Sequence, residues 1–324
     1  MSFNKKHAIG AAVAVALSLS AQADLITFDP TGTPGAAGNI VNVQTFDYAP
    51  GNALAIGVNS TTGITAGTNF TLLYQANLGI VLNNIGTNVY TNGISNFFTA
   101  VAGFGETVAT CTGSPCGTAT FAFNAASTTN FFKIYQVTTT ASNLGGTGFT
   151  SSTLILSGRV IADGFGSNFL VTSADAGALD QSGGVDNYLG IKTIGGIGAT
   201  ALTVKIDTVN ANYFPDLLAG GFLSFSAFNT SQILPFREAD PSDCFVNLTG
   251  TTSCAINNNI GNFNGRPING SIGGGQDIQF QADSNQSFGR RAVPEPATLA
   301  LMGMGLLGLG LGLGATGRAR RKNA

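Results

Sequence analysis

The sequence predicts an all-β protein whose body is an antiparallel β-sandwich or a jelly roll of two packed sheets. Over residues 24–290, short apolar and aromatic runs alternate with clusters of Gly, Asn, Ser and Thr, which is typical of strands joined by turns. Several runs alternate apolar and polar side chains with a period of two. No run of comparable length carries the 3.6-residue stripe of an amphipathic helix.

The composition favours a folded chain with a neutral polar surface. Only 9% of the 324 residues are charged, against roughly 25% in an average soluble domain, while 44% are hydrophobic. Disordered segments combine high net charge with low hydrophobicity, so this composition argues against disorder. We expect an outer surface built from Thr, Ser, Asn and Gly.

The clearest strands are the segments in which the alternation is strict. Residues 202–207, 222–228 and 277–281 place apolar side chains on one face and polar side chains on the other. Residues 180–190 and 257–275 are rich in Gly, Asn and Asp and are expected to be loops, the second of them a tether to the C-terminal tail. The remaining strand candidates, in chain order, are residues 40–48, 69–82, 97–109, 119–123, 131–138, 153–162 and 168–172.

The N-terminal segment, residues 1–23, has the three parts of a secretory signal peptide. Two lysines form a positive start, residues 8–19 are uncharged and apolar, and Ala21 and Ala23 form a small-x-small cleavage site. Because the apolar run is too short to span a bilayer as a resident helix, we expect a signal helix that the general secretion machinery recognises and that is cleaved after Ala23. The alternative is a short amphipathic or buried helix.

The C-terminal tail, residues 291–324, carries a second membrane signal. Residues 297–317 contain no charge and, at 1.5 Å per residue, would form a helix about 30 Å long, which matches the hydrocarbon thickness of a bilayer. By the positive-inside rule, the basic residues beyond that span hold the C-terminus on the cytoplasmic side and leave the body outside. These basic residues are Arg318, Arg320, Arg321 and Lys322.

This tail resembles the PEP-CTERM sorting signal of Gram-negative bacterial surface proteins. The resemblance covers the tail alone and rests on Val293, Pro294, Glu295 and Pro296, followed in order by the apolar span and the basic end. It implies that exosortase, a membrane cysteine protease and transpeptidase, cuts near the triplet, so that the helix holds the chain in the membrane only transiently. It also implies a destination at the cell surface or in the extracellular matrix. The alternative, a plain single-pass anchor, gives no reason for the triplet.

The charges of the body argue against nucleic acid as a partner. Between residues 24 and 289, six basic residues stand against fifteen acidic ones, and phosphate binding needs clustered Lys and Arg. The one histidine, His7, lies in the expected signal peptide. The mature body would therefore lack the residue on which Ser-His-Asp and Cys-His catalysis depend, and we expect no enzyme.

The four cysteines are expected to form disulfides, because an exported chain enters an oxidising compartment and their number is even. Three pairings are possible, and the simplest joins Cys111 to Cys116 and Cys244 to Cys254, each closing a loop or hairpin. A zinc site is the alternative, but the second pair is spaced too widely for a usual zinc motif.

A group of carboxylates provides one candidate metal site. Glu238, Asp240 and Asp243 lie close together in the sequence and could form an acidic cluster or a calcium loop, since Ca²⁺ takes several carboxylate and carbonyl oxygens. The alternative is a solvated turn beside Cys244. No other cofactor is expected.

These features together predict an exported, non-enzymatic protein with a structural or adhesive role in a biofilm, floc or exopolysaccharide matrix. Its expected partners are exosortase and the secretion machinery, with exopolysaccharide as a further candidate. The alternative is a carbohydrate- or calcium-binding, lectin-like module, which chelator-sensitive binding to a glycan array would distinguish. A polysaccharide hydrolase or lyase is a further alternative, but it would need two convergent carboxyl groups, and the sequence identifies no such pair.

Overall fold

The computed structural model describes residues 25–33, 40–58, 65–113, 116–178, 192–231, 244–257 and 277–289. The chain divides into two compact units, residues 1–289 and 290–324, and every described residue belongs to the first. Within the described ranges, no helix is long and apolar enough to cross a membrane. The expected signal helix in residues 1–23 and the expected C-terminal helix in residues 297–317 lie outside these ranges.

The described residues form an all-β fold with antiparallel pairing, as the sequence predicts. The strands are β1 (Ile26–Phe28), β2 (Ile40–Tyr48), β3 (Gly51–Ile56), β4 (Asn69–Asn83), β5 (Asn88–Thr91), β6 (Phe97–Thr112), β7 (Thr118–Phe123), β8 (Asn130–Val137), β9 (Thr153–Ala178), β10 (Lys192–Val209), β11 (Phe222–Ser231), β12 (Cys244–Phe245), β13 (Ile256–Asn257) and β14 (Ile278–Gly289).

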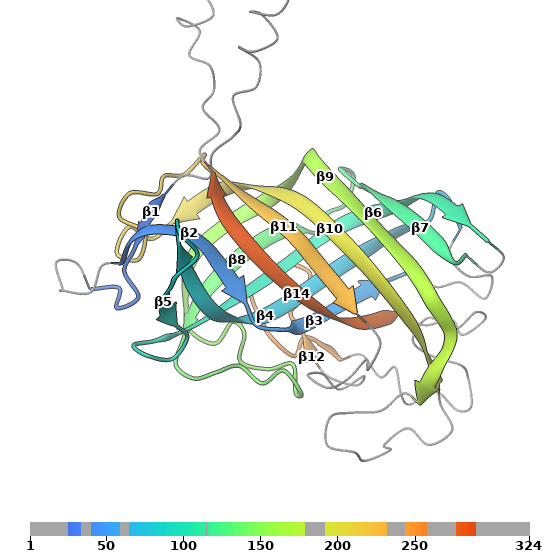
Figure 1. The fold of residues 1–324 in the computed structure, drawn as a ribbon, viewed down its shortest axis with the longest axis horizontal. Coiled ribbons are helices and arrows are strands. Elements are labelled where there is room, and N and C mark those ends of the chain that lie inside the picture. The colour runs from blue at the N-terminus through green and yellow to red at the C-terminus, as the bar shows by residue number, and fades with distance from the viewer. Residues whose placement is uncertain are drawn as a thin grey trace, which may run out of the picture. The chain divides into compact units, whose positions relative to one another are not determined.

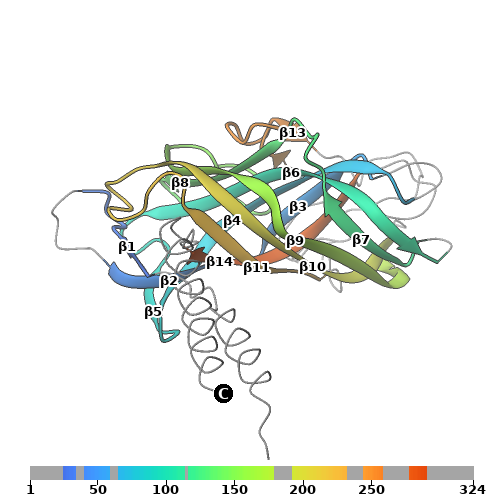
Figure 2. The ribbon, with the colours of Figure 1, turned by 90° about the horizontal axis from the view of Figure 1, so that it is seen from above.

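The large sheet closes on itself. One circuit of hydrogen-bonded neighbours runs β3–β4–β6–β7–β9–β10–β11–β14 and returns to β3. Along a second circuit, β2 takes the place of β3, and β8 takes the place of β7. Figure 1 shows β14, β11 and β10 crossing in front of β4 and β6, and Figure 2 gives the view at right angles. The two facing layers expected from the sequence are therefore walls of one continuous sheet.

Strand β9 shows how a long strand bends to follow the closed sheet. The sequence suggested two segments, residues 153–162 and 168–172, whereas the structure has one strand of 26 residues. The gap between the two predicted segments contains Gly164. Its φ is +73°, a backbone conformation that residues with a side chain rarely adopt. The pairing of β9 with β10 also shifts register at several points. Such irregularities bend a strand without ending it, which lets it curve around the interior.

Strand β3 was not predicted, and its burial gives the reason. All but the last of its residues are buried, so both faces are covered and no alternation of apolar and polar residues is required. Ala53 and Ala55 face the interior, while Leu54 packs on the outer face. The short strands β1, β5, β12 and β13 also escaped prediction, because two to four residues are too few to show a period.

The interior near β1 is filled by aromatic rings. Phe28 is fully buried, and its ring centroid lies 5.0 Å from that of Phe46, 5.2 Å from Phe98 and 5.4 Å from Phe214. Aromatic pairs at these distances add to the hydrophobic contribution of their burial. Most of the phenylalanines in the described ranges are buried and serve as core, and the interior is less completely filled elsewhere.

Candidate functional site

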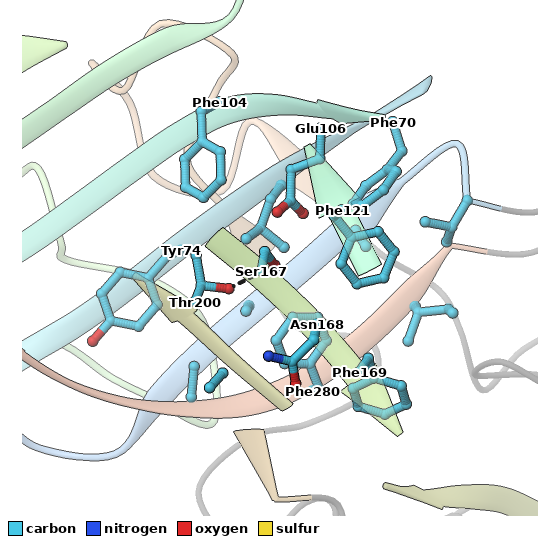
Figure 3. A pocket seen from close by; sticks show the side chains of 17 residues that line it. Phe70, Tyr74, Phe104, Glu106, Phe121, Ser167, Asn168, Phe169, Thr200 and Phe280 are labelled. Atoms are coloured by element: carbon cyan, nitrogen blue, oxygen red, sulfur yellow. Dashed lines mark hydrogen bonds between the residues drawn. The ribbon is translucent and has the colours of Figure 1, made fainter. Parts of the chain in front are cut away.

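A cavity of about 70 Å³ lies inside the closed sheet, between side chains of β3, β4, β6, β7, β9, β10 and β14 (Figure 3). Its lining is almost wholly apolar and comes from most strands of the first circuit. The lining residues are Ala53, Ala55, Val58, Phe70, Leu72, Tyr74, Phe104, Glu106, Phe121, Ser167, Asn168, Phe169, Ala199, Thr200, Ile278, Phe280 and Ala282.

The cavity exists because small and large side chains meet across the interior. Alanines of β3, β10 and β14 leave room opposite the phenylalanines of β4, β6 and β7. Phe121, Phe169 and Phe280 are only half-buried, so they form a rim that solvent reaches. Gly196 of β10 permits this arrangement, since a Cβ there would lie 2.2 Å from the ring of Phe169.

Glu106 places a carboxyl group in this apolar cavity. Alternate residues of β6 face the interior, so Glu106 continues the row that contains Phe98, Ala100, Ala102 and Phe104. The Glu106 side chain is 2% exposed, and its Oε1 forms no hydrogen bond to any described residue. A buried acceptor without a donor costs free energy, because the hydrogen bonds to water that it loses are not replaced.

Burial raises the pKa of Glu106 from an ordinary 4.5 to about 7, while a hydrogen bond with Ser167 opposes part of this shift. The Ser167 Oγ also lies 2.9 Å from Thr200 Oγ1. A hydroxyl carries a single proton, so when Ser167 donates to the carboxylate, Thr200 donates to Ser167. Burial therefore moves the titration of this carboxyl group toward neutral pH, where it can accept or release a proton.

Tyr74 is the other titratable side chain of the lining, and it stays neutral. Its hydroxyl lies 2.6 Å from Ser284 Oγ, and burial raises its pKa. Glu106 is the only carboxylic acid among the residues that line the cavity.

A second feature, on the outside of the sheet, is a cap formed by residues 138–152 and 244–257, here called the outer cap. Phe149, Phe245 and Val246 of the outer cap pack with Leu73 and Val101 of the sheet in a separate buried cluster. The cluster shows why the outward-facing residues of β4 and β6 are apolar, which a sheet with a solvated outer face would not require.

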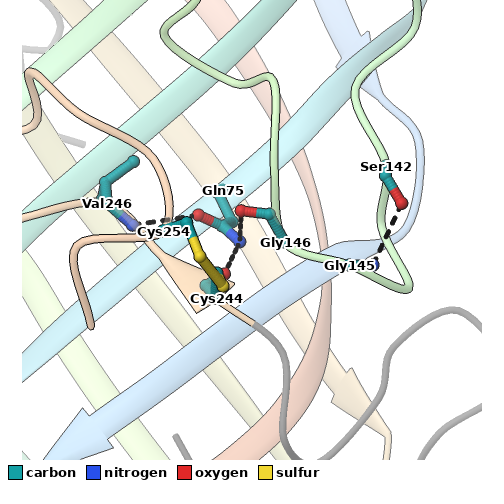
Figure 4. The surroundings of a disulfide bond; sticks show 7 residues. All are labelled: Gln75, Ser142, Gly145, Gly146, Cys244, Val246 and Cys254. Carbon is teal, nitrogen blue, oxygen red and sulfur yellow. Dashed lines mark hydrogen bonds between the residues drawn. A yellow bond between two sulfur atoms is a disulfide. The ribbon is translucent and has the colours of Figure 1, made fainter. Parts of the chain in front are cut away.

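Gln75 of β4 fastens the outer cap to the sheet (Figure 4). Its Nε2 donates to the backbone oxygen of Cys244 at 2.7 Å, and the backbone N–H of Val246 donates to its Oε1 at 3.2 Å. Gly146 allows the two halves of the cap to approach, because its φ is +64° and a Cβ would lie 1.8 Å from the Cys244 oxygen. The Gln75 Nε2 also donates to the backbone oxygen of Gly146 at 3.5 Å. Gln75 is fully buried, so these bonds form without competition from water.

The cysteines pair locally, which confirms the simplest of the three expected pairings. Cys111 bonds to Cys116 and closes the turn between β6 and β7, while Cys244 bonds to Cys254 within the outer cap. The disulfide of the outer cap thus holds together the segment that Gln75 contacts.

The other predicted site residues lie outside the described part of the chain. This applies to the signal cleavage site at Ala21 and Ala23 and to the candidate calcium ligands Glu238, Asp240 and Asp243. Within the described ranges, no group of three or more His, Cys, Asp or Glu side chains is placed to hold a metal ion. The sorting residues that also lie outside are Val293, Pro294, Glu295, Pro296, Arg318, Arg320, Arg321 and Lys322.

Glu106 was not predicted as a site residue, although the sequence pattern around it carried a signal. The segment 97–109 was predicted as a strand, and counting by two from Phe98 places Glu106 on the face of Phe104. A lone acid on the apolar face of a strand indicates a buried ionisable group, and such groups often lie at functional sites.

Comparison with known proteins gives no relative from which a function could be transferred. No protein-family model matches the chain, and no curated protein or solved structure matches it significantly.

Proposed function

We propose that the chain is an exported protein of the cell surface or extracellular matrix, sorted by exosortase, with a structural or adhesive role. The observation that carries the proposal is the pair of local disulfides, Cys111–Cys116 and Cys244–Cys254, because disulfides persist in oxidising compartments. The expected signal peptide and the PEP-CTERM-like tail agree with this destination.

The outer face of the sheet supports a role outside the cell by its chemistry. Exposed hydroxyl groups pair across neighbouring strands, with Thr110 and Thr120 at 2.6 Å and Ser157 and Thr208 at 2.6 Å. These neutral pairs satisfy polar groups without charge, so at these positions the surface can approach neutral polysaccharide without the cost of desolvating ions. The exposed Arg159–Asp207 ion pair lies on the same face. The two facing walls then act as a sandwich-like scaffold for this surface.

Mass spectrometry of protein recovered from the surface material of the native host tests the sorting proposal. We expect a mature chain that begins at Asp24, ends near residues 293–296 and yields disulfide-linked peptides for both cysteine pairs. A host without exosortase is the control, and it should retain the C-terminal segment. Recovery from the normal host of chains that still carry residues 297–324 would contradict the proposal.

A further inference from the structure

The cavity around Glu106 has the features of a recognition site for a small ligand. It combines an apolar lining with one carboxyl group whose Oε1 has no hydrogen-bond donor among the described residues. Glu106 is 2% exposed, and no Lys, Arg or His is present among the lining residues to neutralise it. A complementary ligand would therefore carry a positively charged hydrogen-bond donor attached to a small apolar group.

We propose that this cavity binds a small apolar amine, with its ammonium group against the Glu106 carboxylate and its hydrocarbon chain among the phenylalanine rings. An ammonium group would supply the missing donor and pair with the charge in one contact. Phe70, Phe104 and Phe121 surround the carboxyl group in Figure 3, and aromatic faces attract ammonium groups.

The size of the cavity limits the ligand to a short chain. A buried cavity of about 150 Å³ holds benzene, and this cavity is close to half that volume at about 70 Å³. At that ratio the cavity holds about three non-hydrogen atoms, the ammonium nitrogen and two carbons, and we expect the remainder of a short unbranched alkyl chain to lie against the half-buried rings at the rim.

The chemistry of the lining distinguishes an amine from other small ligands. A carboxylate ligand would place a second negative charge beside Glu106 and be repelled. A sugar would need many hydrogen-bonding partners, whereas most of the lining is Phe, Ala, Ile, Val and Leu. An alcohol could bond to the carboxylate but would leave its charge without a counterion.

The titratable side chains that line the cavity determine how binding should depend on pH. Glu106 and Tyr74 are the titratable side chains that line the cavity, and Tyr74 remains neutral because burial raises its pKa. An alkyl amine stays protonated up to about pH 10, as a lysine side chain does. Binding should therefore strengthen as the pH rises from 5 to 8, where Glu106 loses its proton, and it should stay strong up to about pH 10.

Calorimetric titration of the purified full-length chain with n-butylamine, n-butanol and butyrate tests the proposal. At pH 8 we expect n-butylamine to bind at least roughly tenfold more tightly than n-butanol, with no binding of butyrate. Glu106→Gln should weaken n-butylamine binding by roughly tenfold or more, since it removes the charge and keeps the shape. Asp207→Asn, which removes an exposed carboxyl group on the outer face, is the matched control and should bind as the parent does.

Four results would overturn the proposal: no binding of n-butylamine, equal binding by Glu106→Gln and the parent, an equal affinity for n-butanol, or binding of butyrate. Circular dichroism confirms that the variant is folded. If Glu106→Gln does not fold, the parent chain alone decides the question. A roughly tenfold or greater gain in n-butylamine affinity between pH 5 and pH 8 supports the amine site, and a constant affinity refutes it.

Discussion

Replacing Glu106 by glutamine tests whether its buried carboxyl group destabilises the fold above neutral pH. Glutamine keeps the size and one acceptor oxygen of the side chain and removes its charge. The unfolded chain releases the Glu106 proton near pH 4.5, whereas the folded chain releases it near pH 7. Between these values the folded state holds the extra proton, so the contribution of Glu106 to stability is present below pH 4.5 and is lost as the pH rises through 7.

The size of the effect follows from the shift in pKa. A difference of one pKa unit corresponds to about 1.4 kcal/mol, so the shift from 4.5 to about 7 corresponds to about 3 kcal/mol. Because Glu106 is 2% exposed, solvent screening hardly reduces this value. We therefore expect Glu106→Gln to raise the free energy of unfolding by about 3 kcal/mol at pH 8 and by less than about 1 kcal/mol at pH 5.

Urea unfolding of the parent and the variant at both pH values measures this difference. Desolvation also raises the pKa of Asp47, Asp277 and Asp283. The pH dependence of the parent's stability therefore contains contributions from several carboxyl groups. The difference between variant and parent cancels their contribution and isolates Glu106. If the variant gains the same stability at pH 5 as at pH 8, the reasoning about burial is wrong.

Three further predictions concern the outer cap and the surface. Phe245→Ala should lower the free energy of unfolding, measured with urea, by about 3–5 kcal/mol, because the Phe245 side chain is fully buried and its removal leaves a cavity. A loss below about 1 kcal/mol would show that the outer cap contributes little to stability. Replacing Cys244 and Cys254 together by serine should lower the free energy of unfolding by about 2–3 kcal/mol and increase proteolysis of the outer cap. Unchanged proteolysis would contradict the inference that this disulfide holds the outer cap together. Arg159→Ala should change stability by less than about 0.5 kcal/mol, since its ion pair with Asp207 is solvent-exposed, and a larger loss would mean that this pair is not screened.

Strict alternation in the sequence marks strands with one covered and one solvated face. In β10, the alternation from Leu202 to Ile206 follows the pleat, and these apolar residues are buried in the structure. In β3, the outer face lies under the outer cap, so Leu54 and Ala55 are both buried and the alternation disappears. Period-two alternation therefore identifies a strand only where the surroundings of its two faces differ. Strands β4 and β6, whose central residues are buried on both faces, were predicted instead as apolar and aromatic runs between turn residues.

The site was partly visible in the sequence. Glu106 could be assigned to the apolar face of its strand by counting from Phe104, but its isolation could not be inferred. That isolation depends on which side chains the other walls bring near, including Ser167 and Thr200 from two later strands. Gln75 is a similar case, because its partners Cys244 and Val246 lie about 170 residues away in the sequence.

The sequence by itself determined the properties that depend on near neighbours in the chain. Period-two alternation and turn-forming residues specify antiparallel strands, and short separations favour the pairing of Cys111 with Cys116 and of Cys244 with Cys254. The tertiary structure decided the closure of the sheet, the outer cap and the cavity around Glu106. These features depend on register between strands far apart in the chain, which single-strand patterns do not specify.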